Sequence, residues 1–271
     1  MPGQVQLSND EQMSLLSARF PQRDEPNFAW GNVGSFYSIL PALRAFWPCG
    51  PQISTAQSLL IADTANNFHL SAIHSPLFGY ESLIQYVDFD GANDYATYAD
   101  NAQFDIIGNE AYNVVPGLTL GCWVKPDNVA SANSQYILSK WDNANALLSS
   151  YRLIIGGSVL QIAINTGVAT AGGASTSTMV NGVWQFIAGR FRPGTFLDVY
   201  LSTSVGVLET TSNATALATI FNSALNFEMA ADASNQWWYN GKVSLAWICA
   251  SALSDTMINA LYQLSRPLFG Q

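Results

Sequence analysis

Charged residues are scarce in this sequence of 271 residues. Only 11% of its residues are charged, against about 25% in an average soluble domain. So few charges suggest either a surface largely covered by neighbouring molecules or the polar, uncharged β surface of an extracellular particle. The 10 Lys and Arg residues are scattered and are outnumbered by 19 Asp and Glu residues. Because nucleic acid binding needs clustered positive charge, this distribution argues against a nucleic acid partner.

Cysteines and long apolar runs are also scarce. Cys49, Cys122 and Cys249 are an odd number at wide spacings, which indicates neither a disulfide framework nor a metal knuckle. Cys122 and Cys249 fall inside apolar strand patterns, which favours small buried residues. We expect no membrane span and no signal peptide, because no run of roughly 18 apolar residues occurs and the first residues are neither basic nor apolar. A protein without an export signal can still leave a cell inside a virus particle.

Patterns for catalysis are missing as well. Glycoside cleavage needs two carboxylates about 5 to 10 Å apart, yet no two of the six Glu residues lie within four positions of each other. Asp88 and Asp90 share a strand face, but their position beside Gly91 favours a turn-forming role. His69 and His74 have neither a nucleophile elbow nor metal ligands at zinc spacing. The sequence therefore predicts no catalytic residue and no cofactor.

The sequence does contain a succession of short strand patterns separated by turns. Residues Tyr86–Tyr98 alternate apolar and polar side chains on both sides of Gly91, which predicts a strand, a turn and a strand. Further strands are expected over residues 43–48, 118–124, 136–141, 151–155, 159–164, 184–191, 197–201 and 240–249. Residues 167–177 indicate an exposed loop or edge, and residues 252–262 a short helix. Regular short strands of this kind indicate an all-β sandwich or jelly roll, which we expect over residues 43–271.

Residues 1–42 differ from the rest. Ser8 and Glu11 form a capping pattern, which predicts a short helix that ends before Pro21. The segment after it is too short for a core of its own but too aromatic for a solvated tail. We therefore expect an N-terminal arm that packs either on its own domain or on a neighbouring subunit. The candidate contact residues of this arm are Phe20, Phe28, Trp30, Phe36 and Tyr37.

Five motifs resemble, in order, those of laminin-G-like domains of the concanavalin A-like jelly-roll group. They lie at residues 61–69, 88–96 (Asp-Phe-Asp-Gly-Ala-Asn-Asp-Tyr-Ala), 118–126, 184–191 and 241–262. This resemblance implies a two-sheet jelly roll of a kind that usually binds or builds rather than catalyses. The ending of the chain, with Arg266-Pro-Leu-Phe-Gly270, is similar to laminin-G-like proteins that tailed phages carry as virion components.

The resemblance also raises the question of whether this chain binds calcium. Some relatives build a calcium site with an acidic residue in the closing strand, where this chain has Lys242, Val243 and Ser244. Oxygen ligands for calcium could still come from Asp63, Asp88, Asp90, Asn93 and Asp94. The alternative is that these residues form turns and bond their own backbone, as Asp and Asn beside Gly commonly do.

Our main hypothesis is a non-enzymatic structural component of a tailed-phage virion, placed on the capsid or the tail, that binds itself as a homo-oligomer and other virion proteins. The alternative is a carbohydrate-binding module that recognises a surface glycan, on a tail fibre or as a secreted lectin-like protein. Trp237, Trp238 and Tyr239 are the candidates for stacking on sugars, and packing against the arm is their alternative role. We also expect Trp123 and Trp184 to be buried, since each lies in an apolar strand pattern.

Overall fold

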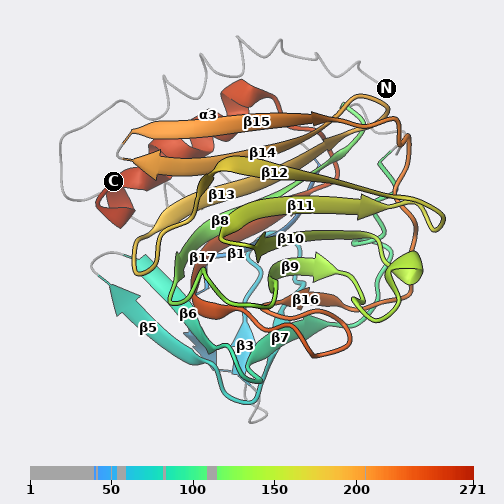
Figure 1. Cartoon of the computed structure of the whole chain (residues 1–271). Helices are drawn as coiled ribbons and strands as arrows, with labels where there is room; N and C mark the ends of the chain where they lie inside the picture. Colours follow the sequence, from blue (N-terminus) through green and yellow to red (C-terminus); the bar gives the residue numbers. More distant parts are fainter. Residues whose placement is uncertain are drawn as a thin grey trace, which may run out of the picture.

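The computed structural model describes residues 40, 42–49, 51–53, 59–81, 84–108, 115–204 and 206–271. Two antiparallel sheets form the layers of a sandwich, and a short helix near the C-terminus lies against one of them (Figure 1). The all-β sandwich and its C-terminal helix are therefore confirmed. The arm predicted for residues 1–42 falls almost wholly outside the described residues, and its candidates fall entirely outside them. These candidates are Phe20, Phe28, Trp30, Phe36 and Tyr37.

The first sheet has the strand order β15-β14-β13-β8-β17-β6-β5, and β1 pairs with β17 off this path. Its strands are β1 (Leu43–Trp47), β5 (Leu77–Glu81), β6 (Ile84–Asp90), β8 (Leu118–Pro126), β13 (Gln185–Arg192), β14 (Phe196–Ser204), β15 (Val207–Ala214) and β17 (Asn240–Cys249). The last strand of the chain, β17, lies in the middle of the sheet and pairs with β8, β6 and β1. The sheet is therefore complete only when the whole chain has folded.

The second sheet has the order β12-β11-β10-β9-β16-β7-β4-β3-β2. Its strands are β2 (Pro51–Ile53), β3 (Leu59–Ile61), β4 (Leu70–Ile73), β7 (Tyr95–Tyr98), β9 (Gln135–Lys140), β10 (Tyr151–Gly156), β11 (Val159–Asn165), β12 (Thr170–Thr178) and β16 (Phe227–Met229). Residues 167–177, expected as a loop or an edge, form a turn and most of the edge strand β12. Among the described residues, no helix is long and apolar enough to cross a membrane.

The main hydrophobic core fills the space between the two sheets. Because successive side chains of a strand point to opposite faces, alternate residues of each strand enter this core. On β8 the fully buried core residues are Leu118, Leu120, Cys122 and Val124. Each fully buried side chain of this size contributes about 1.5 to 3 kcal/mol relative to an exposed one, so the core is the main source of the protein's stability.

All three cysteines lie buried as free thiols. Burial raises the pKa of the Cys49 thiol to about 12, and burial also raises the pKa of Cys122 and that of Cys249. These thiols therefore stay protonated at neutral pH. The prediction that Cys122 and Cys249 are small buried residues is confirmed.

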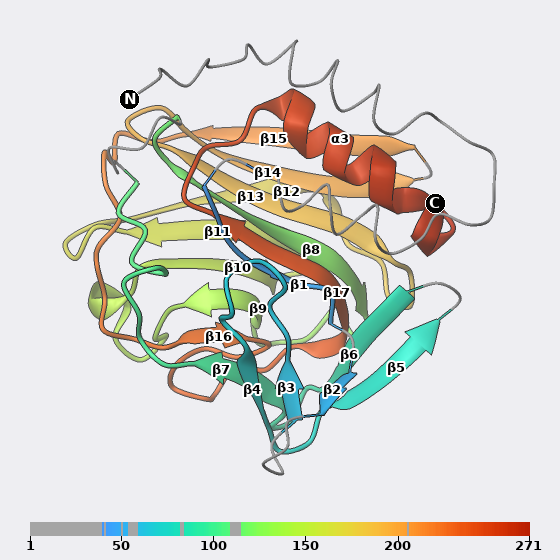
Figure 2. The same cartoon turned by 180° about the vertical axis from the view of Figure 1, so that it is seen from behind.

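The outer face of the first sheet is covered by α3 (Asp255–Ser265) and by the short η2 helix (Arg266–Phe269), as Figure 2 shows. Under them, Trp123 stacks on Phe269 with ring centroids 4.1 Å apart, and its Nε1 donates to the Ser265 hydroxyl at 2.8 Å. Trp123 is fully buried and Trp184 is 5% exposed. The predicted burial of both tryptophans is confirmed.

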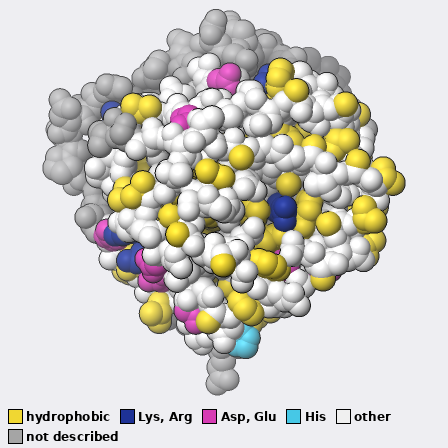
Figure 3. All heavy atoms as spheres, viewed as in Figure 1, with side chains coloured by type: hydrophobic (Ala, Val, Ile, Leu, Met, Phe, Trp, Pro, Cys, Tyr) yellow, Lys and Arg dark blue, Asp and Glu magenta, His cyan; other side chains and the backbone are white. Residues whose placement is uncertain are grey.

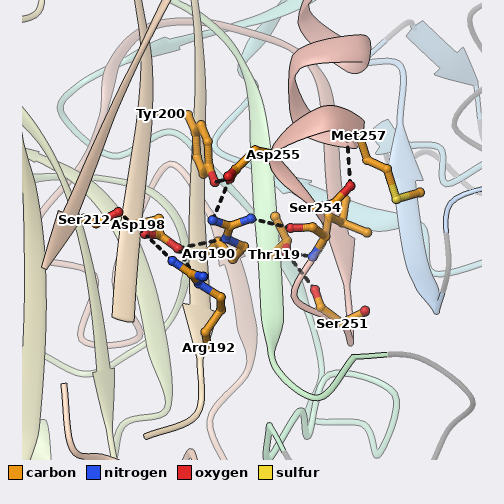
Figure 4. Close-up of polar contacts among 11 residues, drawn as sticks. Thr119, Arg190, Arg192, Asp198, Tyr200, Ser212, Ser251, Ser254, Asp255 and Met257 are labelled. Atoms are coloured by element: carbon orange, nitrogen blue, oxygen red, sulfur yellow. Dashed lines mark hydrogen bonds and ion pairs between the residues drawn. The ribbon is translucent and has the colours of Figure 1, made fainter. Parts of the chain in front are cut away.

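A network of charged groups fastens the start of α3 to the first sheet (Figure 4). Arg190, which is buried on β13, pairs with Asp198 through Nε at 2.8 Å and with Asp255 through Nη2 at 2.7 Å. Its Nη1 donates to the Leu253 carbonyl at 2.6 Å. Asp198 also accepts from Arg192 at 3.0 Å, and Tyr200 donates to Asp255. Each charge in this network has a partner, so the cluster is structural.

We predict that Asp198→Ala destabilises the protein by about 3 to 5 kcal/mol, because it leaves the buried Arg190 guanidinium without its partner on β14. Urea denaturation followed by tryptophan fluorescence measures this change. The matched control is Asp127→Ala, since Asp127 is exposed and such substitutions change stability by about 0.5 kcal/mol or less. Equal unfolding midpoints for Asp198→Ala and the parent would contradict the prediction.

Candidate functional site

Two of the carboxylates considered as calcium ligands, Asp63 and Asp90, are occupied by backbone N–H groups. The buried Asp63 carboxylate accepts hydrogen bonds of 2.8 to 2.9 Å from the N–H groups of four residues. The Asp90 carboxylate accepts from three, at 2.8 to 3.2 Å, and so holds the turn at Gly91 as predicted. Asp88 makes no such bond in the described chain, so the turn-forming role predicted for it was wrong, and it faces Lys242 across the strand pair. No described group of three or more His, Cys, Asp or Glu side chains is placed to hold a metal ion.

Glu228 on β16 is the carboxyl that most resembles a catalytic acid. Burial raises its pKa to about 8, although hydrogen bonds from Thr97 and Asn226 oppose this shift. A raised pKa is often found at functional sites, but Glu228 is only 3% exposed and one of its oxygens is buried without a partner. A substrate cannot reach this carboxyl in the folded protein. Glu228 is therefore a buried acid of the second sheet.

A small hydrophobic cluster, separate from the main core and from the residues under α3, lies on the outer face of the second sheet. Tyr136, Trp141, Ile154 and Ala163 form it, and Ala146 and Trp237 pack against it. Together with Arg152 these residues are called the outer cluster below. They come from β9, β10, β11 and the two loops 141–150 and 230–239, which meet at this face. The outer cluster is the candidate functional site.

Strand geometry explains why these side chains point away from the core. On β10, Tyr151, Leu153 and Ile155 enter the main core, so the residues between them point outward. The pairing of β10 with β9 shifts between Leu153 and Ile154, which marks a β-bulge, a feature that re-aims side chains. As a result Tyr136 points outward although its strand neighbours Ile137 and Leu138 both belong to the core.

Arg152 lies over the aromatic rings of the outer cluster. Its guanidinium carbon is 4.4 Å from the Trp141 ring centroid and 5.4 Å from that of Tyr136. Its Nη1 also donates to the Tyr136 hydroxyl. An attraction between a cation and an aromatic ring contributes about 0.5 to 2 kcal/mol. These contacts fix the plane of the guanidinium while leaving the side chain partly exposed.

Hydrogen bonds to Asp232 fasten the two loops to each other. The buried Asp232 carboxylate accepts from the N–H groups of Asn143 at 3.2 Å, Gln236 at 3.0 Å and Trp237 at 3.2 Å. In addition, the N–H of Ala233 donates to the carbonyl of Trp141 at 2.8 Å. The position of the Trp237 backbone is therefore fixed relative to the 141–150 loop and its tryptophan.

Several N–H donors of this region have no acceptor. They are shielded from solvent and unpartnered: Nε1 of Trp141, Nε of Arg152, Nε1 of Trp237 and Nε1 of the neighbouring Trp238. The short η1 helix (Ala146–Leu148) places Leu147 and Leu148 at the surface beside them, 55% and 50% exposed. Figure 3 looks onto this side of the molecule and shows hydrophobic side chains around a basic one. The region combines an apolar surface with donors that lack partners.

The three residues proposed for sugar stacking do not lie together. Trp237 packs against the outer cluster, and Trp238 is partly buried. Tyr239 is fully buried in the main core, because the chain turns inward before β17: its N–H donates to the Ala230 carbonyl at 2.9 Å. The prediction that Tyr239 is a candidate for stacking on sugars was therefore wrong.

Sequence reasoning missed Tyr136, Trp141 and Arg152. The signal for Arg152 was present, since it alternates with Tyr151 and Leu153 and so had to face away from them. No pattern in the sequence brings Trp141 and Trp237 together, because that contact depends on the meeting of two distant loops.

The pKa of Glu228 predicts how stability depends on pH. The folded protein keeps a proton up to about pH 8 that the unfolded chain releases near its ordinary pKa of 4.5, so stability falls as pH rises through this interval. Each unit of difference corresponds to about 1.4 kcal/mol. We predict that Glu228→Gln, which keeps an acceptor for Thr97, is more stable than the parent at alkaline pH. Urea denaturation at several pH values checks this, and equal pH dependence in both proteins would contradict it.

Comparison with known proteins finds no matching family model and no similar curated sequence. Solved structures do match. The botulinum neurotoxin serotype G binding domain has 12% identity and a TM-score of 0.59, over 82% of this chain and 51% of that one. The serotype D ligand-binding domain, in complex with N-acetylneuraminic acid, has 12% identity and a TM-score of 0.56, over 85% and 52%.

A third match is the binding domain of Paraclostridial Mosquitocidal Protein 1, with 11% identity and a TM-score of 0.57, over 80% of this chain and 51% of that one. This chain thus spans about half the length of the structures that it matches. At such low identity the likeness shows the fold alone. The neighbours named here are binding domains rather than catalytic ones.

Proposed function

We propose that this chain is a non-enzymatic binding module that recognises a surface glycan through the outer cluster. The observation that carries this proposal is the partly exposed Trp237 in the same cluster as the partly exposed Arg152, which forms no ion pair within the described chain. A guanidinium only donates hydrogen bonds, so a ligand rich in oxygen atoms can bind it. Aromatic rings offer the apolar faces on which sugar rings stack.

Two further observations support this function. The structural neighbours are binding domains, and one of them was solved with N-acetylneuraminic acid, which is a sugar. The carboxyl with the most acid-like pKa, Glu228, is shielded from solvent, which favours binding over glycan cleavage. The resemblance to laminin-G-like domains agrees with a domain that binds rather than catalyses.

A virion component remains a second candidate function, and one surface feature favours it. Strand β5 forms an edge of the first sheet and exposes Leu77 and Tyr80, which are 71% and 65% accessible. An edge strand with apolar side chains can pair with another chain, either a second copy or another virion protein. The two roles are compatible, because a receptor-recognition module can be carried on a phage tail fibre.

Mass spectrometry of purified phage particles, with copies counted, tests the virion role. We predict that the protein is present in the particle. Hundreds of copies indicate a capsid component, whereas a few to a few dozen indicate a tail or fibre. Its absence from particles would contradict a structural role and leave the glycan-binding module as a separate question.

We predict that Trp237→Ala weakens glycan binding at least about tenfold, a loss of about 1.4 kcal/mol, because it removes the partly exposed ring of the outer cluster. A glycan array identifies the ligand, and isothermal titration calorimetry then gives the affinity. Tyr80→Ala is the matched control, since Tyr80 is an exposed aromatic residue on the edge of the other sheet.

The control distinguishes a binding site on the outer face of the second sheet from one at the edge of the first sheet. We expect Tyr80→Ala to bind as the parent does. A glycan that binds the parent but is lost in Tyr80→Ala and retained by Trp237→Ala would place the site elsewhere. A folded parent that binds no glycan on the array would overturn the function itself.

A further inference from the structure

Arg152 carries a positive charge that forms no ion pair with any described carboxylate. The ion pairs found in the described chain involve Lys125, Lys140, Arg190, Arg192 and Lys242, and none involves Arg152. Two acidic residues, Asp142 and Asp232, act on the neighbouring Tyr136. Asp232 already accepts hydrogen bonds from three backbone N–H groups and from the Ser234 hydroxyl, and Asp142 accepts from the Ala144 N–H.

The contacts of the Arg152 guanidinium leave its Nη2 without a bond in the described chain. Stacking on Trp141 holds the plane of the guanidinium, and Nη1 donates to the Tyr136 hydroxyl. Nε has no acceptor but is shielded from solvent, so a ligand does not reach it, whereas Nη2 is not shielded in this way. Guanidinium N–H groups form strong hydrogen bonds with carboxylates. Nη2 is therefore already oriented to donate to a carboxylate that approaches from solvent.

The guanidinium of Arg152 also discriminates between kinds of ligand. Guanidinium N–H groups only donate hydrogen bonds. A sugar hydroxyl both donates and accepts, so it also needs an acceptor from the protein. A carboxylate only accepts, and hydrogen bonds between charged groups are roughly twice as strong as neutral ones. The guanidinium therefore complements an anionic group better than a neutral one.

We infer that the outer cluster selects acidic sugars, whose carboxylate accepts a hydrogen bond from Nη2 of Arg152 while the sugar ring rests against Trp237. This inference rests on the proposed glycan-binding function and adds the class of ligand to it. The net charge of −9 on the whole chain repels anions at long range. Selection of an acidic sugar is therefore a property of this contact and not of the overall charge.

The test compares probes that differ only in the carboxylate. Binding of sialyllactose, its methyl ester and lactose, and of a glucuronate-containing oligosaccharide with its neutral glucose counterpart, is measured by calorimetry. We expect acidic probes to bind at least about tenfold more tightly than their esters or neutral counterparts. Esterification leaves the protein unchanged, so this comparison does not depend on how any variant folds.

Variants then assign the preference to Arg152. Arg152→Met should abolish the difference between acid and ester, and Arg152→Lys, which keeps the charge but loses the planar fork, should retain only part of it. The matched control is Arg266→Met, which changes the net charge equally but lies in η2 against the other sheet. Its preference for acidic probes should equal that of the parent. Melting temperatures establish that each variant is folded.

The possible failures are distinguishable. Glycans that bind equally as acid and as ester would overturn the selection of acidic sugars and leave glycan binding intact. A preference that survives in folded Arg152→Met would also overturn the inference, because the carboxylate would then bind elsewhere. If no glycan of either kind binds the parent, the proposed function fails and this inference fails with it.

Discussion

The need of each sheet to cover both of its faces is the constraint on which this structure depends. The inner faces cover each other and form the main core. The central strand β17 is buried on both sides from Val243 to Cys249, so the first sheet needs a second cover. α3 and η2 supply it, with Trp123 stacked on Phe269. Over β9 to β11 the described chain places no α-helix on the second sheet, and its cover is made from Tyr136, Arg152 and the two loops that carry Trp141, Ala146 and Trp237.

The two outer faces differ in how their charged groups are paired. The buried charges of the first sheet, around Arg190 and Asp198, satisfy one another and fix α3 in place. The charge on the outer face of the second sheet, Arg152, stacks on aromatic rings and forms no ion pair with any described residue. Folding alone does not require such a site, because an apolar side chain at position 152 would cover Trp141 without leaving a donor unpaired. The proposed sugar binding would give a physical reason for an arginine at that position.

Much of the sandwich could be predicted from alternation along single strands. Residues Tyr86–Tyr98 became β6, the turn held by Asp90, and β7, and the strand expected from Leu118 became β8. β16 and β4 were not recognised, because three or four residues are too few to show a period of two. β15 was missed because its exposed face is polar and its sequence has the composition of a loop.

The candidate site was less predictable, because contacts between distant segments create it. Asn143 and Asp232, which fasten its two loops, are 89 positions apart, and a bulge set by the neighbouring strand turns Tyr136 outward. The burial of Tyr239 follows from the same long-range geometry. The buried thiols have a separate consequence for experiment. Cys49, Cys122 and Cys249 follow or belong to three different strands, and a thiol reagent reaches them only when the sandwich opens. The rate at which each thiol is labelled therefore measures local opening of the sandwich around that cysteine. Mass spectrometry of the labelled peptides then shows which strand separates first.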